Sequence, residues 1–298
     1  MICVGVDAGG TSTLAAVSEN GVARREAKGP GANATTIGVD DAADVIIKVI
    51  RNALGGAHPA SIHVGAAGAG RESVAEHLRE LIAVAFRGAK VAVGGDAAIA
   101  LRAAIPDGDG AVVIAGTGSV AYAENGTRTH RAGGLGYLAG DEGSAFWIGM
   151  QAVRLYGRVL DGRARRDETT DLVARALDAP NRDAYLSALY DGEMRPEKIA
   201  ALAPSIVAFA GKGNVASTKI VQQAALELGE LLKSTLRAVD LLGAAPPVAL
   251  AGGLFAENTL LSFLLETRIN GDVPGVAIVR RGEAPVRGAL RLAERAVR

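Results

Sequence analysis

The chain has little of several residue types, and each shortage excludes a class of protein. Its 298 residues include one cysteine, Cys3, which excludes an intrachain disulfide framework, a cysteine-rich zinc site and a self-contained iron–sulfur cluster. The 32 basic and 32 acidic side chains cancel, which argues against bulk attraction to nucleic acid or to an anionic membrane. No run approaches the roughly 20 apolar residues of a membrane span, and the start lacks the features of a signal peptide. We therefore expect a cytoplasmic protein.

Glycine, by contrast, is abundant. The chain has 39 glycines, about 13% of its residues against a usual ~7%, and they follow no Gly-X-Y period. Hydrophobic residues make up 49% and charged residues 21%, which is ordinary for a globular protein with a large core. At roughly 150 residues per domain, the length favours two domains. The excess glycine is concentrated in a few short segments, where backbone can approach a ligand closely.

The apolar patterns predict an α/β protein. In the first third they predict strands and helices in the order strand–strand–strand–helix–strand–helix–strand–helix, over Ile2–Val6, Thr13–Val17, Val22–Lys28, Val39–Leu54, Ile62–Ala67, Glu72–Phe86, Lys90–Val93 and Ala97–Ala104. Hairpins followed by alternating helices and strands indicate a sheet with mixed strand directions.

The same opening pattern recurs after a linker signal at Pro106–Gly110. A strand, a Gly/Thr turn, a second strand and an Asn-Gly turn occur in both places, about 107 residues apart. Such a repeat predicts two related α/β domains. The later part reads as mostly helical, with a clear helix at Ser217–Leu242, a strand at Pro246–Leu250, a helix near Glu257–Arg268, a strand at Val276–Val279 and a terminal helix at Val286–Val297.

Two glycine turns have the composition of phosphate-binding hairpins. The first, GVDAGGTST, exposes backbone N–H groups, adds hydroxyl donors and places Asp7 where its carboxylate could hold Mg²⁺. An ordinary glycine hairpin with a capping aspartate is the alternative. The second turn has the same design at the repeated position, which makes the pair more informative than either member. Their candidate phosphate-binding residues are Gly9, Gly10, Thr11, Ser12, Gly116, Thr117, Gly118 and Ser119.

Three further segments are candidates for binding or chemistry. Gly252 and Gly253, between a strand and a helix, allow a flat ring or a phosphate to approach the backbone. Asp96, after a strand, is either a general base acting on a hydroxyl or the N-cap of the helix that follows, and both roles are compatible. The loop from 133 to 143 combines five glycines with Asp141 and Glu142, which suits a polyhydroxylated ligand. The basic cluster Arg163–Arg166 is most simply a solvated loop.

Together these segments resemble the actin-like ATPase and sugar kinase superfamily, and more narrowly the BadF/BadG/BcrA/BcrD-type family. The resemblance rests on GVDAGGTST and VVIAGTGSVAYA for the phosphates, LAGGLFAEN for adenosine and GGLGYLAGDEGSAFWIG as the most family-specific loop. It extends to the terminal GEAPVRGAL and so covers nearly the whole chain. The resemblance implies two ribonuclease-H-like domains with a central cleft that holds ATP, Mg²⁺ and a sugar.

The resemblance also implies roles and boundaries. It implies an N-terminal domain of residues 1–106 plus 285–298 and a C-terminal domain of residues 107–284 with helical insertions. Asp96 would deprotonate the acceptor hydroxyl and Asp7 would lie near the metal. Phosphoryl transfer needs mainly positioning and charge neutralisation, which these groups can supply. The sugar would contact Asn33, Asp96, Gly134, Leu135 and Asp141, although similar amino-sugar kinases often have tryptophan at the position of Leu135.

The expected activity is therefore an ATP-dependent transfer of phosphate to a hydroxyl of N-acetylglucosamine or a related hexose, with O6 as the first candidate. The chain could form a homodimer. One alternative is an ATP-driven activator of the same family, but those proteins use cysteines to hold an iron–sulfur cluster between subunits, and this chain has only Cys3. Another is an actin-like assembly or chaperone protein, for which the chain is short.

Overall fold

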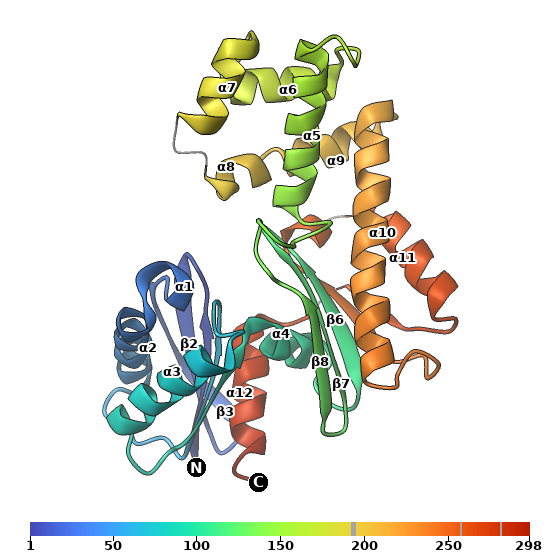
Figure 1. The fold of residues 1–298 in the computed structure, drawn as a ribbon. Coiled ribbons are helices and arrows are strands. Elements are labelled where there is room, and N and C mark those ends of the chain that lie inside the picture. Colours follow the sequence, from blue (N-terminus) through green and yellow to red (C-terminus); the bar gives the residue numbers. More distant parts are fainter. Residues whose placement is uncertain (192–194, 257, 281) are drawn as a thin grey trace. The chain divides into compact units, whose positions relative to one another are not determined.

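The computed structural model describes residues 1–191, 195–256, 258–280 and 282–298 (Figure 1). The chain forms two compact units. Unit 1 comprises Met1–Gly108 and Arg281–Arg298, and unit 2 comprises Asp109–Arg280. Each unit is built on a five-stranded sheet.

The sheet of unit 1 has the order β3-β2-β1-β4-β5. Strands β1, β2 and β3 form an antiparallel meander, whereas β4 runs parallel to β1 and β5 runs parallel to β4. The carboxyl ends of β1, β4 and β5 therefore meet at one edge. The strands span Ile2–Ala8, Ser12–Glu19, Val22–Pro30, Ser61–Ala66 and Lys90–Gly95.

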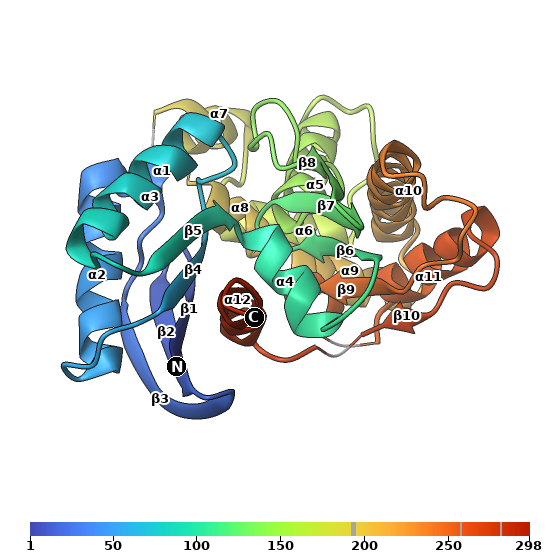
Figure 2. The ribbon, with the colours of Figure 1, turned by 90° about the horizontal axis from the view of Figure 1, so that it is seen from below.

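Helices cover both faces of this sheet. Helices α2 (Val39–Leu54) and α3 (Glu72–Ala85) pack on one face, where alternate residues of β1 and β4 form the core. Helices α4 (Asp96–Ala104) and α12 (Pro285–Arg295) pack together on the other face, as Figure 2 shows. A short helix, α1 (Ala34–Ile37), precedes α2.

Glycines allow α12 to pack closely against β1 and α4. A Cβ on Gly5 of β1 would lie 2.1 Å from the backbone nitrogen of Leu290, and one on Gly288 would lie 1.9 Å from the carbonyl oxygen of Ile99 in α4. Backbone thus packs directly on backbone at both crossings. The C-terminal helix is consequently an integral layer of unit 1, although the 172 residues of unit 2 separate it from the rest in sequence.

The sheet of unit 2 repeats the design of the first. Its order is β10-β9-β6-β7-β8, with β6, β7 and β8 antiparallel and with β9 and β10 parallel to β6. Position for position this is the order seen in unit 1, so the repeat predicted from the sequence is confirmed at the level of topology. The strands span Gly110–Ala115, Ser119–Asn125, Arg128–Gly133, Val248–Ala251 and Ile278–Val279.

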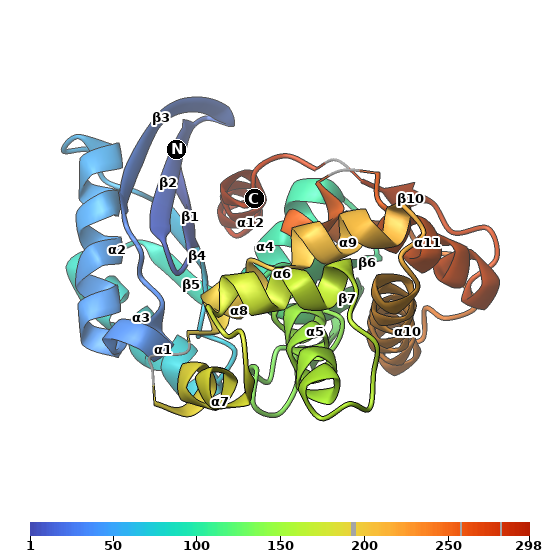
Figure 3. The ribbon, with the colours of Figure 1, turned by 90° about the horizontal axis from the view of Figure 1, so that it is seen from above.

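Unit 2 differs by its helices. Helix α10 (Val215–Ala238) lies against the sheet and beside α11 (Leu260–Asp272), as Figures 1 and 3 show. Five helices gather at one end of the unit, beyond the sheet (Figure 1). They are α5 (Ala145–Leu160), α6 (Glu168–Ala176), α7 (Arg182–Tyr190), α8 (Pro196–Ala200) and α9 (Ala203–Gly211).

A single core joins the helices of unit 2 to the inner face of its sheet. Within the described part of the chain, no single helix is long and apolar enough to cross a membrane. The bent pair Pro196–Gly211 and Val215–Ala238 meets that test only when taken together. Many residues of α9 and α10 are buried in the core.

Candidate active site

The first glycine turn is a tight hairpin between β1 and β2. The N–H of Gly9 donates to the carbonyl of Ser12 at 3.0 Å, which closes the turn. A Cβ added to Gly10 would meet nothing within 4 Å, so the backbone is open on that side. The segment that contains Asn33 packs on the same turn, because Ala32 donates to the carbonyl of Gly9 at 2.9 Å. The predicted phosphate turn and the predicted sugar contact are thus adjacent in unit 1.

Asn33 is half-buried and has a structural role. Its Oδ1 accepts a hydrogen bond from the N–H of Thr35 at 2.9 Å and caps α1. Gly68, with φ +85°, fits closely against this cap, since a Cβ there would lie 2.7 Å from Oδ1 of Asn33. The amide oxygen is therefore committed to the cap, which leaves the NH₂ group as the donor for a ligand.

Asp7 and Asp96 lie at the same edge of the sheet of unit 1. Asp7 pairs in register with Gly65 of β4, and Gly65 pairs with Gly94 of β5, two residues before Asp96. The strand between the two aspartates thus has a glycine at the matching position and places no side chain between them. Asp96 is the first residue of α4, and Gly95 is its N-cap, so the alternative in which Asp96 caps the helix was wrong.

The two carboxylates influence each other electrostatically. Burial, and after it the negative charge of Asp96, raises the pKa of the Asp7 carboxyl to about 6. A divalent cation beside Asp7 would relieve both effects. Mg²⁺ prefers hard oxygen ligands and typically takes only one or two carboxylates, with phosphate and water oxygens completing its shell. The residues at this edge fit that requirement, although the described residues contain no cluster of three potential metal ligands.

The second glycine turn is fixed to the loop that follows β8. The N–H of Ser119 donates to Oδ1 of Asp141 at 3.2 Å, and the Ser119 hydroxyl donates to the carbonyl of Glu142 at 2.7 Å. The carbonyls of Gly116 and Thr117 accept from the first backbone N–H groups of α5, at 2.9 and 3.2 Å. Two motifs that the sequence presents separately therefore form one rigid element of unit 2.

Asp141 is held in an unusual environment. Its φ of +62° lies in the left-handed region, where aspartate and asparagine are among the few non-glycine residues found. A Cβ on Gly118 would lie 2.8 Å from its Oδ1, so a larger residue there would have to displace the Asp141 carboxylate. Burial raises the pKa of Asp141 above its ordinary value, and the N–H of Ser119 and the positive charge of Arg131 oppose that rise.

The turn between β8 and Asp141 exposes its backbone. The N–H of Gly134 donates to the carbonyl of Ser119 at 2.8 Å, and its φ of +67° requires glycine. The side chain of Leu135 is 72% exposed and so is available to a ligand rather than to the core. Ser144 caps α5 by accepting from the N–H of Trp147 at 3.1 Å, and Phe146 is buried.

A cavity of about 430 Å³ adjoins the third glycine segment in unit 2. Gly252 has φ +98°, and a Cβ there would lie 2.3 Å from the carbonyl oxygen of Ala115, so β9 ends tightly against β6. The cavity begins at Gly253 and has apolar walls, which suits the flat ring of a nucleoside. Its lining includes Pro204, Val207, Gly253, Leu254, Asn258 and Thr259. Glu257, part of the adenosine motif, lies outside the described residues.

Pro204 and Val207 were not found by sequence reasoning. They belong to α9, about 50 residues before the glycine segment, and nothing in their own pattern distinguishes them from other core positions. The cavity identifies them as lining residues only because α9 packs beside the end of β9.

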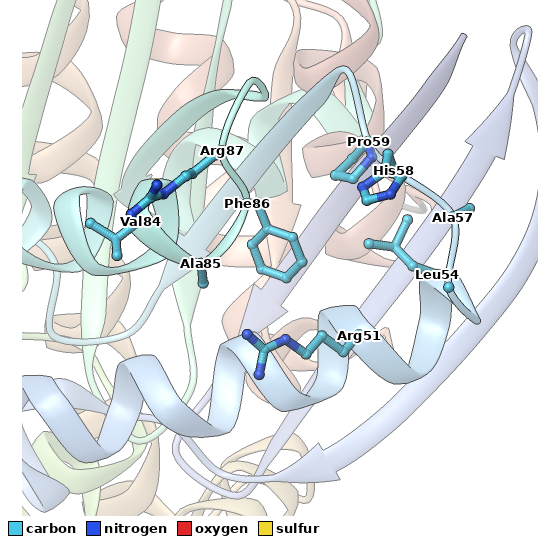
Figure 4. A pocket seen from close by; sticks show the side chains of 10 residues that line it. Arg51, Leu54, Ala57, His58, Pro59, Val84, Ala85, Phe86 and Arg87 are labelled. Carbon is cyan, nitrogen blue, oxygen red and sulfur yellow. The ribbon is translucent and has the colours of Figure 1, made fainter.

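Unit 1 has another cavity, of about 560 Å³, at the opposite end of its sheet (Figure 4). Its lining includes Arg51 and Phe86, which contact each other with 6.0 Å between the guanidinium carbon and the ring centre, and His58 and Arg87. These residues precede β4 and β5, whereas Asp7 and Asp96 lie where the parallel strands end. The cavity is thus separate from the candidate active site.

The chain is similar to several known sugar kinases. A crystal structure of a candidate N-acetylglucosamine kinase from Chromobacterium violaceum superposes with a TM-score of 0.74 at 26% identity, covering 98% of both chains. A ROK family glucokinase from Streptomyces griseus, solved with glucose and AMPPNP, gives 0.59 at 20% identity and covers 99% of this chain and 100% of the other. The N-acetylmuramic acid/N-acetylglucosamine kinase of Clostridium acetobutylicum is 26% identical, over 97% of each chain.

The fold is the two-domain α/β fold of the actin-like ATPases and sugar kinases, as the sequence predicted. Within that class, the model of the BadF/BadG/BcrA/BcrD ATPase family matches residues 4–293. The chain belongs to the BadF/BadG/BcrA/BcrD ATPase family.

Proposed function

We propose that this protein is an ATP-dependent kinase that transfers the γ-phosphoryl group to a hydroxyl, O6 in the first instance, of N-acetylglucosamine or a closely related amino sugar. The observation that carries the proposal is the fixed connection between the second glycine turn and Asp141. One element of unit 2 would thereby present both N–H groups for a phosphate and a carboxylate that could accept hydroxyl hydrogen bonds from a sugar. Two relatives that match nearly the whole chain are named as kinases of amino sugars.

Each unit would supply a different part of the reaction. The cavity beside Gly253 would hold the adenosine, and the turn Gly116–Ser119 would bind phosphate through its N–H groups. In unit 1, the turn Gly9–Ser12 would bind phosphate in the same way through the residues after Gly9, whose own N–H closes the turn. Asp7 would hold Mg²⁺, which neutralises developing charge on the phosphates when it is bound. These groups are preorganised, so they lose little freedom when the transition state forms.

Asp96 would act as the general base. Asp96 is the first residue of α4 and directly follows β5, at the edge of the sheet where Asp7 also lies. The carboxylate would accept the proton of the acceptor hydroxyl as the oxygen attacks phosphorus. The Asp96 carboxylate, the NH₂ group of Asn33 and the backbone near Gly134 and Leu135 would orient the sugar, with Asp141 accepting from its hydroxyls.

We further propose that the enzyme works in the cytoplasm, where ATP is available, on a small-molecule sugar and with neither nucleic acid nor membrane as a partner. A homodimer is the proposed assembly. Light scattering coupled to gel filtration tests it directly, because a monomeric mass of 30.3 kDa at assay concentrations would contradict it.

A panel of sugars in a coupled ADP-release assay tests the proposed activity. We expect strong acceleration of ADP release by N-acetylglucosamine, compared with glucosamine, N-acetylmuramic acid, glucose and mannose, and we expect chelation of Mg²⁺ to abolish it. ATP hydrolysis that none of these sugars accelerates would contradict the kinase assignment and favour an ATP-driven switch instead.

A further inference from the structure

A cavity of about 390 Å³ in unit 2 is bordered by four arginines. Arg154 and Arg158 lie one turn apart on α5, Arg163 lies in the following turn, and Arg182 begins α7. Helices α5 and α7 contact each other. The backbone N–H groups of Arg163 and Ala164 both donate to the carbonyl of Arg158, at 2.8 and 3.1 Å. The turn therefore folds back and brings Arg163 to the same cavity.

These arginines have too few negative partners. Asp161 is the one acidic residue among those that border the cavity, and it is bound by Nη2 of Arg163 at 2.5 Å. Arg154, Arg158 and Arg182 form no salt bridge with any carboxylate in the parts of the chain that the structure describes. Arg182 is close enough to lower the pKa of Asp161, after the larger effect of Arg163. The cavity thus has a net positive charge in a chain whose total charge is zero.

The four arginines are exposed, and two features of their placement disfavour positive charge slightly. Two arginines at positions i and i+4 repel each other on the helix surface. Arg182 occupies the first position of α7, where the helix dipole disfavours a positive charge. The sequence interpretation treated Arg163–Arg166 as a solvated loop, and Arg163, Arg165 and Arg166 are indeed exposed, with Arg163 also bordering the cavity.

We propose that this cavity binds a small phosphorylated metabolite. Guanidinium groups bind phosphate oxygens in bidentate fashion, and several of them can surround one phosphate. The volume is within the range of small-molecule sites, and the side chains of Leu160, Tyr185 and Leu186 add an apolar wall for the rest of the ligand. None of these residues belongs to the candidate active site, so the proposal does not depend on the kinase reaction.

Calorimetric titration of the full chain with inorganic pyrophosphate, at low salt and without Mg²⁺, tests the proposal. The variant Arg158→Gln/Arg182→Gln removes two of the unpaired charges, and Arg165→Gln is the matched control, since Arg165 is exposed in the same loop but does not border the cavity. Pyrophosphate binding at the glycine turns is common to all three proteins. We expect the affinity of the arginine-lined cavity for pyrophosphate to be at least tenfold weaker in the double variant than in the wild type. In the control it should be unchanged.

Equal pyrophosphate binding by the wild type and the double variant would overturn the proposal, as would an equal loss in the control. The same titration with a 12-nucleotide single strand provides a further test. Tighter binding of the strand than of pyrophosphate, lost in the double variant, would also overturn the proposal, because it would show that the cavity binds an extended polyanion. Since the variant could perturb folding, Arg158→Lys/Arg182→Lys provides a second test. It retains the charges but not the bidentate geometry, and we expect an intermediate affinity. Kinase kinetics of the variants separate a failure of this site from a failure of the proposed activity.

Discussion

The backbone N–H of Ser119 donates a hydrogen bond to the Asp141 carboxylate, at 3.2 Å across 22 residues of sequence. This bond joins a turn with the composition of a phosphate site to a loop with the composition of a sugar site. If both ligands bind there, a change to the Asp141 carboxylate should weaken the binding of the sugar and of the nucleotide together.

Asp141→Asn tests this coupling. Asparagine tolerates the positive φ of this position and can still accept the bond from Ser119, so we expect stability to fall by no more than about 1 kcal/mol. The charge is lost, however, and we expect KM for the sugar to rise at least tenfold, with a smaller rise for ATP. Steady-state kinetics with both substrates measure this, and Glu142→Gln is the control. An unchanged sugar KM would show that Asp141 is only structural.

Glycine substitutions separate folding from phosphate binding. A Cβ at Gly118 would strike the Asp141 carboxylate, so Gly118→Ala should destabilise the protein by about 1–3 kcal/mol. A Cβ at Gly116 or Gly10 meets nothing in the protein, so alanine there should leave the melting temperature unchanged or slightly higher.

The alanine substitutions at Gly10 and Gly116 should nevertheless weaken ATP binding. If phosphate approaches this backbone, a methyl group obstructs hydrogen bonds to a charged group that are worth about 1.5–3 kcal/mol each. We expect KM for ATP to rise tenfold or more in Gly10→Ala and in Gly116→Ala. Normal ATP kinetics in both variants would contradict phosphate binding by these turns.

The raised pKa of Asp7 predicts a pH-dependent stability. The folded protein retains a proton on Asp7 up to about pH 6, whereas the unfolded chain releases it near 3.8. Between these values the folded state binds more protons, so this carboxyl makes the protein less stable as pH rises, by at most about 3 kcal/mol. Asp7→Asn should therefore be more stable than the wild type at pH 7.5 without Mg²⁺, and the difference should vanish near pH 4.

Chemical denaturation at the two pH values measures this effect, with Glu80→Gln of α3 as an exposed control in the same unit. Added Mg²⁺ should stabilise the wild type at pH 7.5 but not Asp7→Asn, because the cation removes the cost of the charge. A difference that does not change with pH would mean that the Asp7 carboxyl is not perturbed as described.

Asn33→Asp distinguishes capping from sugar binding. Aspartate retains the oxygen that accepts from Thr35 and so preserves the cap of α1, but it lacks the NH₂ donor. We expect an unchanged melting temperature and a sugar KM raised at least fivefold. Loss of stability with unchanged kinetics would assign Asn33 to the fold alone.

Regular patterns made much of the fold predictable. Helix α2 was predicted at Val39–Leu54, as observed, because its apolar period is clear and glycines flank both ends. Helix α1 was missed, since four residues that include two threonines and an isoleucine have little helical preference and depend on the Asn33 cap. The helix predicted to Leu242 ends at Ala238, where the chain turns into the loop before β9.

The candidate site was predictable in its composition but not in its connections. Glycine turns and carboxylates at strand ends are visible in the sequence. The bond from Ser119 to Asp141, the packing of Gly31 on the carbonyl of Gly10 and the wall formed by Pro204 all join distant segments. Such contacts depend on the tertiary fold, and no local pattern encodes them.

Single-turnover phosphate transfer by Asp96→Asn tests the proposed mechanism most directly. Asparagine has the same shape but cannot accept the proton, so we predict that ATP binding stays within twofold of the wild type while sugar-dependent turnover falls at least 100-fold. Turnover above a tenth of the wild-type rate, with the sugar still required, would contradict the role of Asp96 as the base.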